Sequence, residues 1–289
     1  MFDQGFFERI LSQTFHPGVM IKSIRSTSGG CINNTYRLET DQGYLFVKWN
    51  QDEDERMFET EAMGLKLLKS HFVYQIPEVF GWGQLEGKNY LVMEYVASKD
   101  RDRNYWRNFG ETLALLHQVT SHQFGLDYSN FIGKLPQYNN WMDRWVDFFI
   151  EKRLEVQLEM ASKKGLVNKK IQDQFQKLYM LLPHIFPVEP PALLHGDLWS
   201  GNVVTGSDGN ACIIDPAVFY GAREAELSFT QLFGGFDSDF YRAYNETYPL
   251  SPGFDERVEV YNLYPLLVHL NLFGSSYLGS IQSILKRYQ

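Results

Sequence analysis

The stretch Leu193-Leu194-His195-Gly196-Asp197-Leu198-Trp199-Ser200-Gly201-Asn202 decides the fold that we expect for this chain. A second stretch, Ile213-Ile214-Asp215-Pro216-Ala217, follows it closely. Each starts with apolar residues that favour a buried strand and then reaches an aspartate. Phosphoryl transfer needs a carboxylate that accepts a hydroxyl proton and oxygen ligands for a metal on the nucleotide phosphates. Asp197, Asn202 and Asp215 provide oxygen atoms of these kinds.

The spacing of these residues follows a known pattern. The catalytic loop of protein kinases reads H-R-D-x-x-x-x-N, and their metal-binding aspartate begins D-F-G. This chain has H-G-D-x-x-x-x-N and D-P-A, the forms found in small-molecule kinases of the same fold. We predict Asp197 as the catalytic base and Asn202 and Asp215 as metal ligands. Two other interpretations explain less of this pattern. The spacing of Asp197 and Asn202 could be plain turn chemistry. His195 could be half of a metal site, but no nearby His or Cys completes a ligand set.

The composition narrows the class of protein. The chain has 289 residues, 44% of them hydrophobic, which suffices for one large domain or two lobes. No apolar run reaches the length of about 18 residues that spans a membrane, and no secretory signal is visible. Two cysteines, Cys31 and Cys212, make no disulfide framework, so a cytoplasmic location is expected. A net charge of −8 without a basic block argues against nucleic acid as a partner.

A glycine pair in the first part of the chain predicts a phosphate-binding loop. Alternating apolar residues indicate strands at 19–26 and through Tyr36 and Leu38, and the pair Gly29-Gly30 lies between them. Glycines at such a place let backbone N–H groups approach phosphates, although a plain hairpin would use them too. Cys31 and Asn33 follow in the same loop and are counted with it.

A lysine and a helical glutamate are predicted next. Lys48 stands near the end of the expected strand 44–49, where kinases place the lysine that pairs the nucleotide phosphates with a glutamate. The following helix is expected to begin near Asp52 or Asp54, since acidic residues suit a helix N-terminus. Its glutamates Glu61 and Glu59 are both candidates. We favour Glu61, which leads into the pattern Glu-Ala-x-x-Leu.

The strand that ends at Val96 is expected to lead into the connection between two lobes. There the carbonyl of Glu94 and the amide of Val96 are predicted to pair with adenine, and Met93 is also counted as nucleotide-binding. Beyond it we expect helices at 102–119, 141–160, 167–182 and 224–287, with a loop-like segment at 120–140. Only about seven residues separate Asp-Pro-Ala from the last helical region. This short segment favours a small acceptor over a protein segment.

These observations predict an α+β fold of the bilobal protein-kinase-like type. Residues 1–96 would form a nucleotide-binding lobe with a small β-sheet and one key helix. Residues 97–289 would form a larger, mainly helical lobe that carries the catalytic residues and binds the substrate.

The chain resembles the fructosamine (ketosamine) kinases, which are relatives of aminoglycoside and choline kinases. The likeness covers nearly the whole chain, and its most specific parts are Asp-Leu-Trp-Ser-Gly-Asn and Gly-x-Arg-Glu-Ala. The matching stretches are Gly29-Gly30-Cys31-Ile32-Asn33, Val47-Lys48, Met57-Phe58-Glu59-x-Glu61-Ala62, Met93-Glu94, His195 to Asn202, Ile214 to Ala217, Gly221-x-Arg223-Glu224-Ala225-Glu226, Leu232 to Phe236 and Leu263 to Leu270.

The resemblance implies an activity, its cofactors and a substrate site. The family uses ATP and Mg²⁺ to phosphorylate the 3-hydroxyl of ketosamines, which are sugar adducts of free amines or protein lysines. The phosphorylated adduct decomposes, which leads to deglycation. Trp199 is implied to line the ketosamine pocket, and Arg223 to bind substrate. Ala222 and Glu226 depart from the usual His and Asp. Glu226 is expected to brace the backbone of the catalytic loop.

Other functions stay open beside this one. Another small-molecule kinase would phosphorylate an aminoglycoside, a choline-like molecule or a sugar hydroxyl, and a non-catalytic protein would only bind nucleotide. Cys31 either fills a gap in its loop or is a redox-active thiol that links two chains on oxidation. The expected partner is a small-molecule or lysine-linked ketosamine, with no nucleic acid and no membrane. The chain is expected to be a monomer or a homodimer.

Overall fold

We describe a computed structural model, which covers residues 4–27, 33–51, 54–72 and 75–288. The chain divides into two compact units. The first comprises Met1–Arg103 and Val204–Asp215, and the second comprises Asn104–Val203 and Pro216–Gln289. The catalytic-loop residues Asp197 and Asn202 therefore belong to the second unit, and Asp215 to the first. The division at residue 96 stays a prediction.

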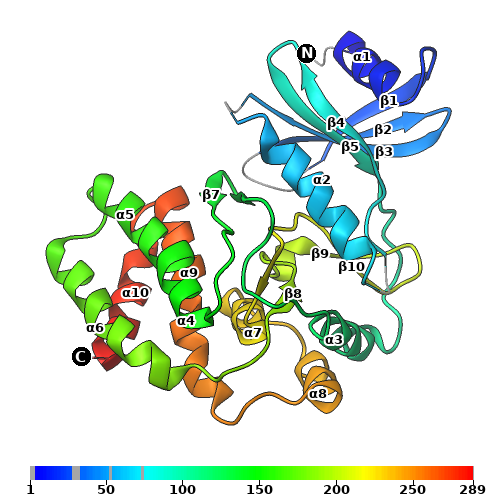
Figure 1. Ribbon diagram of the computed structural model, residues 1–289. Helices are drawn as coiled ribbons and strands as arrows, with labels where there is room; N and C mark the ends of the chain where they lie inside the picture. Colours follow the sequence, from blue (N-terminus) through cyan, green and yellow to red (C-terminus); the bar gives the residue numbers. More distant parts are fainter. Residues whose placement is uncertain (1–3, 28–32, 52–53, 73–74, 289) are drawn as a thin grey trace. The chain divides into compact units, whose positions relative to one another are not determined.

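The first unit is built on a five-stranded antiparallel sheet (Figure 1). Its strand order is β1-β2-β3-β5-β4, so the central strand β3 lies between β2 and β5. A helix, α2, connects β3 to β4, and a short ladder of β9 with β10 leads to Asp215. The bounds are β1 Ile21–Ser26, β2 Asn34–Thr40, β3 Gly43–Asn50, α2 Arg56–Lys69, β4 Val79–Leu85, β5 Lys88–Glu94, β9 Val203–Thr205 and β10 Ala211–Ile213.

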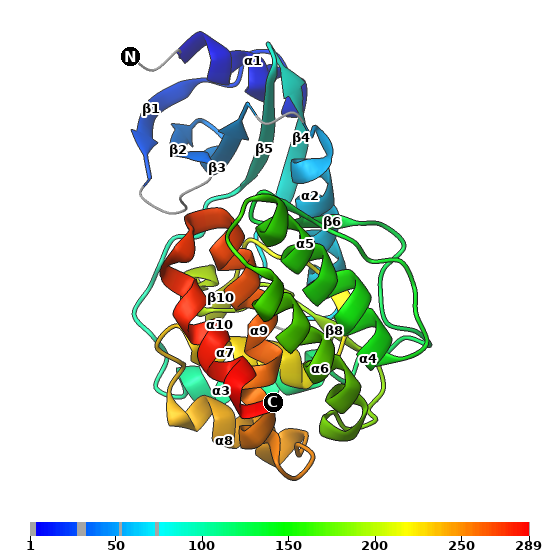
Figure 2. The same ribbon diagram turned by 90° about the vertical axis from the view of Figure 1, so that its left-hand side faces the viewer.

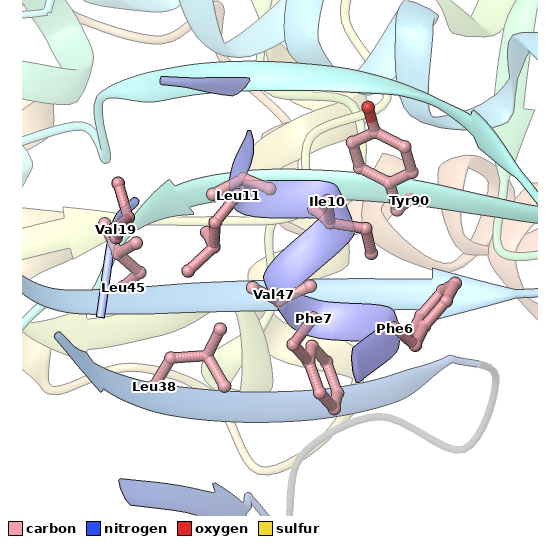
Figure 3. Packing of buried hydrophobic residues seen from close by; sticks show 10 residues of the cluster. Phe6, Phe7, Ile10, Leu11, Val19, Leu38, Leu45, Val47 and Tyr90 are labelled. Carbon is pink, nitrogen blue, oxygen red and sulfur yellow. The ribbon is translucent and has the colours of Figure 1, made fainter. Parts of the chain in front are cut away.

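Helix α1 (Gln4–Thr14) covers one face of this sheet (Figure 3). Its apolar side chains recur at helical spacing, so they share one face. Burial of each such side chain contributes about 1.5–3 kcal/mol, so this contact anchors β3, the strand that carries Lys48. The packed residues are Phe6, Phe7, Ile10 and Leu11 of the helix with Val19, Leu38, Leu45, Val47, Tyr90 and Val92.

Helix α2 begins close to the predicted Asp54, but its N-cap residue is Glu55, whose side chain makes no cap hydrogen bond. The helix begins at Arg56, and the Asp54 carboxylate accepts a 3.1 Å hydrogen bond from the Arg56 amide. An accepting side chain at this point satisfies an amide that has no partner within the helix. Asp52 lies outside the described residues. The helix then buries Phe58, Ala62 and Leu65, which directs its inner face to the sheet.

The second unit is mainly helical (Figures 1 and 2). Helices α3 and α8 lie side by side, and a methyl group at Gly110 would lie 2.2 Å from the Phe240 carbonyl oxygen. The strand β8 pairs with β11 in antiparallel fashion, so the catalytic loop leaves a buried ladder. The bounds are α3 Tyr105–Leu116, α6 Lys169–Ile185, β8 Ala192–Leu194, β11 Phe219–Gly221, α7 Arg223–Leu232, α8 Ser238–Thr247, α9 Phe254–Phe273 and α10 Leu278–Leu285.

Two segments differ in detail from the expectation. The loop expected at 120–140 contains a short hairpin, β6 (Asn130–Ile132) with β7 (Leu135–Gln137). The helix expected at 141–160 is α4 (Trp145–Phe148), a π-helical turn (Phe149–Leu154) and α5 (Glu155–Lys163). No helix among the described residues is long and apolar enough to cross a membrane.

Candidate active site

Lys48 on β3 lies at the centre of the charged groups of the first unit. Its side chain is only 4% exposed, and Nζ lies 2.7 Å from Glu61 Oε1. The same ammonium donates to the Asp215 carboxylate. Glu61 is therefore the α2 glutamate that pairs with Lys48, whereas Glu59 is exposed.

The two carboxylates keep Lys48 positively charged. Burial by itself would lower the pKa of Lys48, but the charges and hydrogen bonds of Asp215 and Glu61 outweigh it and raise the pKa above its ordinary value. A buried ammonium held in this way is a fixed positive charge, which suits the binding of anionic phosphates.

Asp215 has an unusual backbone conformation. Its φ is +57°, a region that costs a residue other than glycine about 1–3 kcal/mol. Such outliers cluster at active sites and ligand clamps. The side chain is 39% exposed although its lysine partner is buried. The carboxylate thus keeps surface on which it can bind a cation.

In the second unit, Gly196 sets the shape of the catalytic loop. Its φ is +84°, and a Cβ there would lie 2.0 Å from the Ala217 carbonyl oxygen. The Ala217 amide also donates to the His195 carbonyl at 2.9 Å. Only glycine allows this close approach. The glycine that replaces the protein-kinase arginine therefore lets the backbone at 217 pack against the loop.

Glu226 holds the same loop from α7, as the sequence led us to expect. Its carboxylate accepts the amides of Gly196 at 2.6 Å and His195 at 3.1 Å. His117 Nε2 lies 2.9 Å from it. Burial would raise the pKa of Glu226, but the hydrogen bond and charge of His117, the charge of His195 and the Gly196 amide lower it overall. The longer side chain of Glu thus reaches both amides.

Asn202 orients the predicted base. Its Nδ2 donates to the Asp197 carbonyl at 2.8 Å and to Asp197 Oδ2 at 3.0 Å. Because the amide nitrogen faces Asp197, the oxygen Oδ1 is left as an acceptor for another group. Amide and carboxylate oxygens are the ligands that Mg²⁺ prefers, and it keeps several waters or phosphate oxygens besides. Asn202 and Asp215 therefore fit the predicted metal by their chemistry.

A cavity lies beside Asp197 in the second unit. It measures about 40 Å³, and Gly196, Asp197, Tyr264 and His269 are among its lining residues. Trp199 lies two positions after Asp197, and a Cβ at Gly201 would come within 2.3 Å of its indole ring. The glycine of Asp-Leu-Trp-Ser-Gly-Asn therefore gives the indole its place.

Sequence reasoning missed a buried arginine in this unit. Arg153 is 1% exposed, and its guanidinium lies 4.0 Å above the ring of Phe219. It donates to the Tyr138 carbonyl and to Asn139 Oδ1, each at 2.7 Å. Burial lowers the pKa of Arg153 to about 10, so it is still charged at neutral pH. In the sequence Arg153 stands in the charged run Glu151-Lys152-Arg153-Leu154-Glu155, which gives no sign that its side chain is buried.

The polar side chains next to Arg153 secure the segment after Asp215. Asn139 donates to Asn130 Oδ1 at 3.0 Å, and Asn130 in turn donates to the Val218 carbonyl at 2.8 Å. Gln137 donates to the Ala217 carbonyl at 3.0 Å. Asn130 and Gln137 belong to the hairpin of β6 and β7, and Asn139 follows it, so this segment fixes the backbone that packs on the catalytic loop.

Arg223 is engaged in structural contacts. It pairs with both oxygens of Glu189, at 2.7 and 2.9 Å, and donates to the carbonyls of Tyr248 and Pro249. Four hydrogen bonds leave little of its donor capacity for a ligand. Its substrate role stays a prediction that these contacts do not favour. Ala222 is the residue before α7 and is buried, with no side-chain cap on the helix.

The predicted adenine contacts lie at the end of β5. The Glu94 amide donates to the Glu78 carbonyl and the Tyr95 amide to the Tyr44 carbonyl, so the two amides point to opposite sides. In extended backbone, the Glu94 carbonyl and the Val96 amide are expected on the side away from Tyr44. Met93 is buried in the sheet.

The predicted phosphate loop falls mainly outside the described residues. Gly29, Gly30 and Cys31 are among those outside, so their roles stay predictions. Asn33 is described, and its side-chain oxygen accepts a 2.9 Å hydrogen bond from Asn50 Nδ2.

Comparison with known proteins gives a consistent result. A family model described as "Fructosamine kinase" matches residues 5–289. A "Probable ketoamine kinase" of Synechocystis is 40% identical, over 96% of this chain and 94% of that protein. The "Protein-ribulosamine 3-kinase, chloroplastic" of Arabidopsis thaliana is 37% identical, over 93% of this chain and 83% of that protein.

Solved structures agree with this comparison. A crystal structure from Haemophilus somnus, named "Putative fructosamine-3-kinase", has a TM-score of 0.87 and 30% identity, over 98% of this chain and 96% of that one. A spectinomycin phosphotransferase has a TM-score of 0.60 at 15% identity, over 98% and 92% of the two chains, which shows the fold alone. The predicted α+β, kinase-like fold is thereby confirmed.

Proposed function

This chain belongs to the fructosamine kinase family, and from that premise we propose that it is an ATP-dependent ketosamine 3-kinase. It transfers the γ-phosphoryl group of ATP to the 3-hydroxyl of a ketosamine carried by a free amine or a protein lysine. The observation that carries the proposal is the loop that presents Asp197, held by Glu226 at its backbone and by Asn202 at its carboxylate.

Asp197 is the group that handles the proton. Its carboxylate accepts the proton of the acceptor hydroxyl while the new O–P bond forms and the bond to ADP breaks. The Asn202 amide holds one carboxylate oxygen at 3.0 Å, which fixes the direction of the other. Positioning and charge neutralisation supply most of the catalysis in such transfers.

The first unit provides the groups for the nucleotide. Lys48, kept in place by Glu61, neutralises the phosphates, and the Glu94 carbonyl and Val96 amide pair with adenine. Gly29, Gly30, Cys31 and Asn33 belong to the loop that would approach the phosphates. Mg²⁺, when bound, supplies charge neutralisation on the phosphates, and the Asp215 carboxylate and Asn202 Oδ1 are the protein oxygens that would hold it.

The short segment after Asp215 supports a small acceptor. Residues 216–222 separate Asp215 from α7, and three of them form β11, which pairs with β8. This leaves no long loop to bind or to present a protein segment. A sugar adduct at the end of a lysine side chain still fits, because only the adduct must reach Asp197.

We also propose a cytoplasmic location, because the chain has only two cysteines.

The two cysteines differ in what is known of them. Burial raises the pKa of Cys212 to about 12, so this thiol is unreactive at neutral pH. The redox role of Cys31 stays a prediction.

Mass spectrometry of a ribated or fructated lysine peptide tests the proposal. Incubation with the enzyme and Mg-ATP should add one phosphate to the adduct and none to the unmodified peptide. Asp197→Asn should abolish the transfer while nucleotide binding remains. ADP release on an aminoglycoside or a choline-like acceptor, with none on either ketosamine, would instead assign the chain to another small-molecule kinase.

A further inference from the structure

Five rings of the second unit form a connected series, which we call the aromatic strip: Trp199, Phe233, His269, Phe273 and Tyr277. The ring centroids of Trp199 and Phe233 lie 6.0 Å apart, and those of Phe233 and His269 lie 4.6 Å apart. His269 continues to Phe273 at 5.5 Å and to Tyr277 at 5.1 Å. Such separations are typical of direct aromatic contacts.

The inner end of the strip lies at the predicted acceptor site. Trp199 belongs to the catalytic-loop motif, and His269 lines the same cavity as Asp197. His269 Nδ1 lies 2.8 Å from the Pro265 carbonyl, which can only accept, so Nδ1 carries the proton. Burial lowers the pKa of His269 although this hydrogen bond opposes it, so the ring is neutral at neutral pH. The His269 ring thus offers an uncharged aromatic face and no positive charge.

The outer end of the strip is open to solvent. Helix α9 lines the cavity from Tyr261 to His269, and Phe273 follows one turn later, about 6 Å along the helix axis. Phe273 is 50% exposed, and Tyr277 in the next short helix (Ser275–Tyr277) is half-buried. Rings that only fill a core, such as Phe240 in the same unit, are fully buried. An exposed aromatic surface that continues from a site is typical of ligand contact.

We propose that the outer pair, Phe273 and Tyr277, binds the amine carrier of the ketosamine, meaning the peptide or amino-acid part beyond the sugar. The sugar itself must stay at Asp197, because its 3-hydroxyl reacts there. The carrier extends beyond the sugar, and this pair is the part of the strip that is open to solvent. Aromatic faces suit the apolar stem of a lysine, the ammonium of the adduct and apolar neighbouring residues. This inference rests on the proposed function.

Two substrates with the same sugar test the inference. One is a fructosyl-lysine peptide with apolar residues beside the lysine, and the other is the same sugar on methylamine. In Phe273→Ala and Tyr277→Ala, KM for the peptide adduct should rise about tenfold with kcat unchanged, which is the signature of lost binding common to ground and transition states. KM for the methylamine adduct should stay within about twofold of wild type.

A matched control and the remaining outcomes complete the experiment. Phe80→Ala removes another partly exposed ring, on β4 of the first unit, and should change neither KM. An equal rise for both substrates, or no rise for the peptide adduct, would overturn the carrier site. If Tyr277→Ala lowers the unfolding midpoint, the half-exposed Phe273 decides the question alone. A wild-type enzyme that phosphorylates neither adduct would reject the proposed function instead.

Discussion

The carboxylate of Glu226 on α7 accepts a 2.6 Å hydrogen bond from the backbone amide of Gly196, which precedes the predicted base Asp197. The same carboxylate accepts the His195 amide, so one buried side chain satisfies two adjacent amides. An unsatisfied buried amide costs about 1–3 kcal/mol. Glu226 therefore stabilises the second unit and at the same time sets the loop geometry from which Asp197 projects.

Two substitutions of Glu226 should distinguish the effect of its carboxylate charge from the effect of its side-chain length. Glu226→Gln retains one acceptor oxygen, so one loop amide loses its partner, and we expect the free energy of unfolding to fall by about 1.5–3 kcal/mol. Turnover should fall too, because the loop loosens. Glu226→Asp keeps two acceptor oxygens and should retain more activity than the Gln variant. Urea unfolding measures the loss of stability, and ADP release measures the loss of turnover. Equal losses in Glu226→Gln and Glu226→Asp would argue against a role of the Glu226 carboxylate in holding the loop.

The lowered pKa of Glu226 makes stability depend on pH. Because the folded protein holds this carboxyl below its ordinary pKa of 4.5, the unfolded chain takes up the proton first as the solution is acidified. Stability then rises with pH in this range. The contribution is complete above about pH 4.5 and is lost as pH falls through the folded pKa. Urea midpoints of wild type and Glu226→Gln should therefore converge as the pH falls below the ordinary carboxyl pKa of 4.5, and a constant gap would contradict this origin.

Removal of the Lys48 charge should impair catalysis and nucleotide binding. Lys48→Met leaves Glu61 and Asp215 without their cation, and the phosphates lose a fixed positive charge. We expect kcat to fall by about 10²-fold, the cost of one preorganised group at a charged transition state. Lys22→Met, at an exposed position on β1, is the control. Titration calorimetry with Mg-ATP should show weaker binding only for the Lys48 variant, and unchanged turnover would remove Lys48 from the site.

The dual contact of Asn202 predicts a metal-dependent defect. Asn202→Ala removes the two hydrogen bonds to Asp197 and the oxygen assigned to Mg²⁺. Both kcat and the apparent affinity for Mg²⁺ should fall, so that excess metal restores activity only in part. Activity measured against Mg²⁺ concentration tests this, and complete recovery at high Mg²⁺ would show that orientation of Asp197 by Asn202 contributes nothing.

The close contact of Gly201 with Trp199 predicts a selective loss of acceptor binding. A methyl group at Gly201 would displace the indole, and overpacking of this kind costs about 1–3 kcal/mol. We expect Gly201→Ala to raise KM for the ketosamine while nucleotide binding is preserved. The control is Gly279→Ala on α10, where a methyl group meets no atom within 4 Å. An unchanged KM for the ketosamine would separate Trp199 from the acceptor pocket.

The sequence by itself was sufficient to predict the kinase-like fold and to identify the family. Asp197, Asn202 and Asp215 can be proposed from the chain because phosphoryl transfer requires particular oxygen atoms, and the first two lie at the short spacing of a kinase catalytic loop. Lys48 can be found because it belongs to an alternating strand just before an acidic helix. Periodicity likewise locates α1, α2, α3 and α6, since each has one apolar face.

Only the tertiary structure decided which side chains meet. The choice of Glu61 over Glu59 depends on the face of α2 that turns to β3, and both glutamates have the same local chemistry. His117 and Glu226 are 109 positions apart, and Arg223 is engaged by Glu189, 34 positions away. Arg153 is held by Tyr138 and Asn139, which directly follow the β6–β7 hairpin. A buried polar group must find partners wherever the packed chain places them, and no local pattern encodes such distant partners.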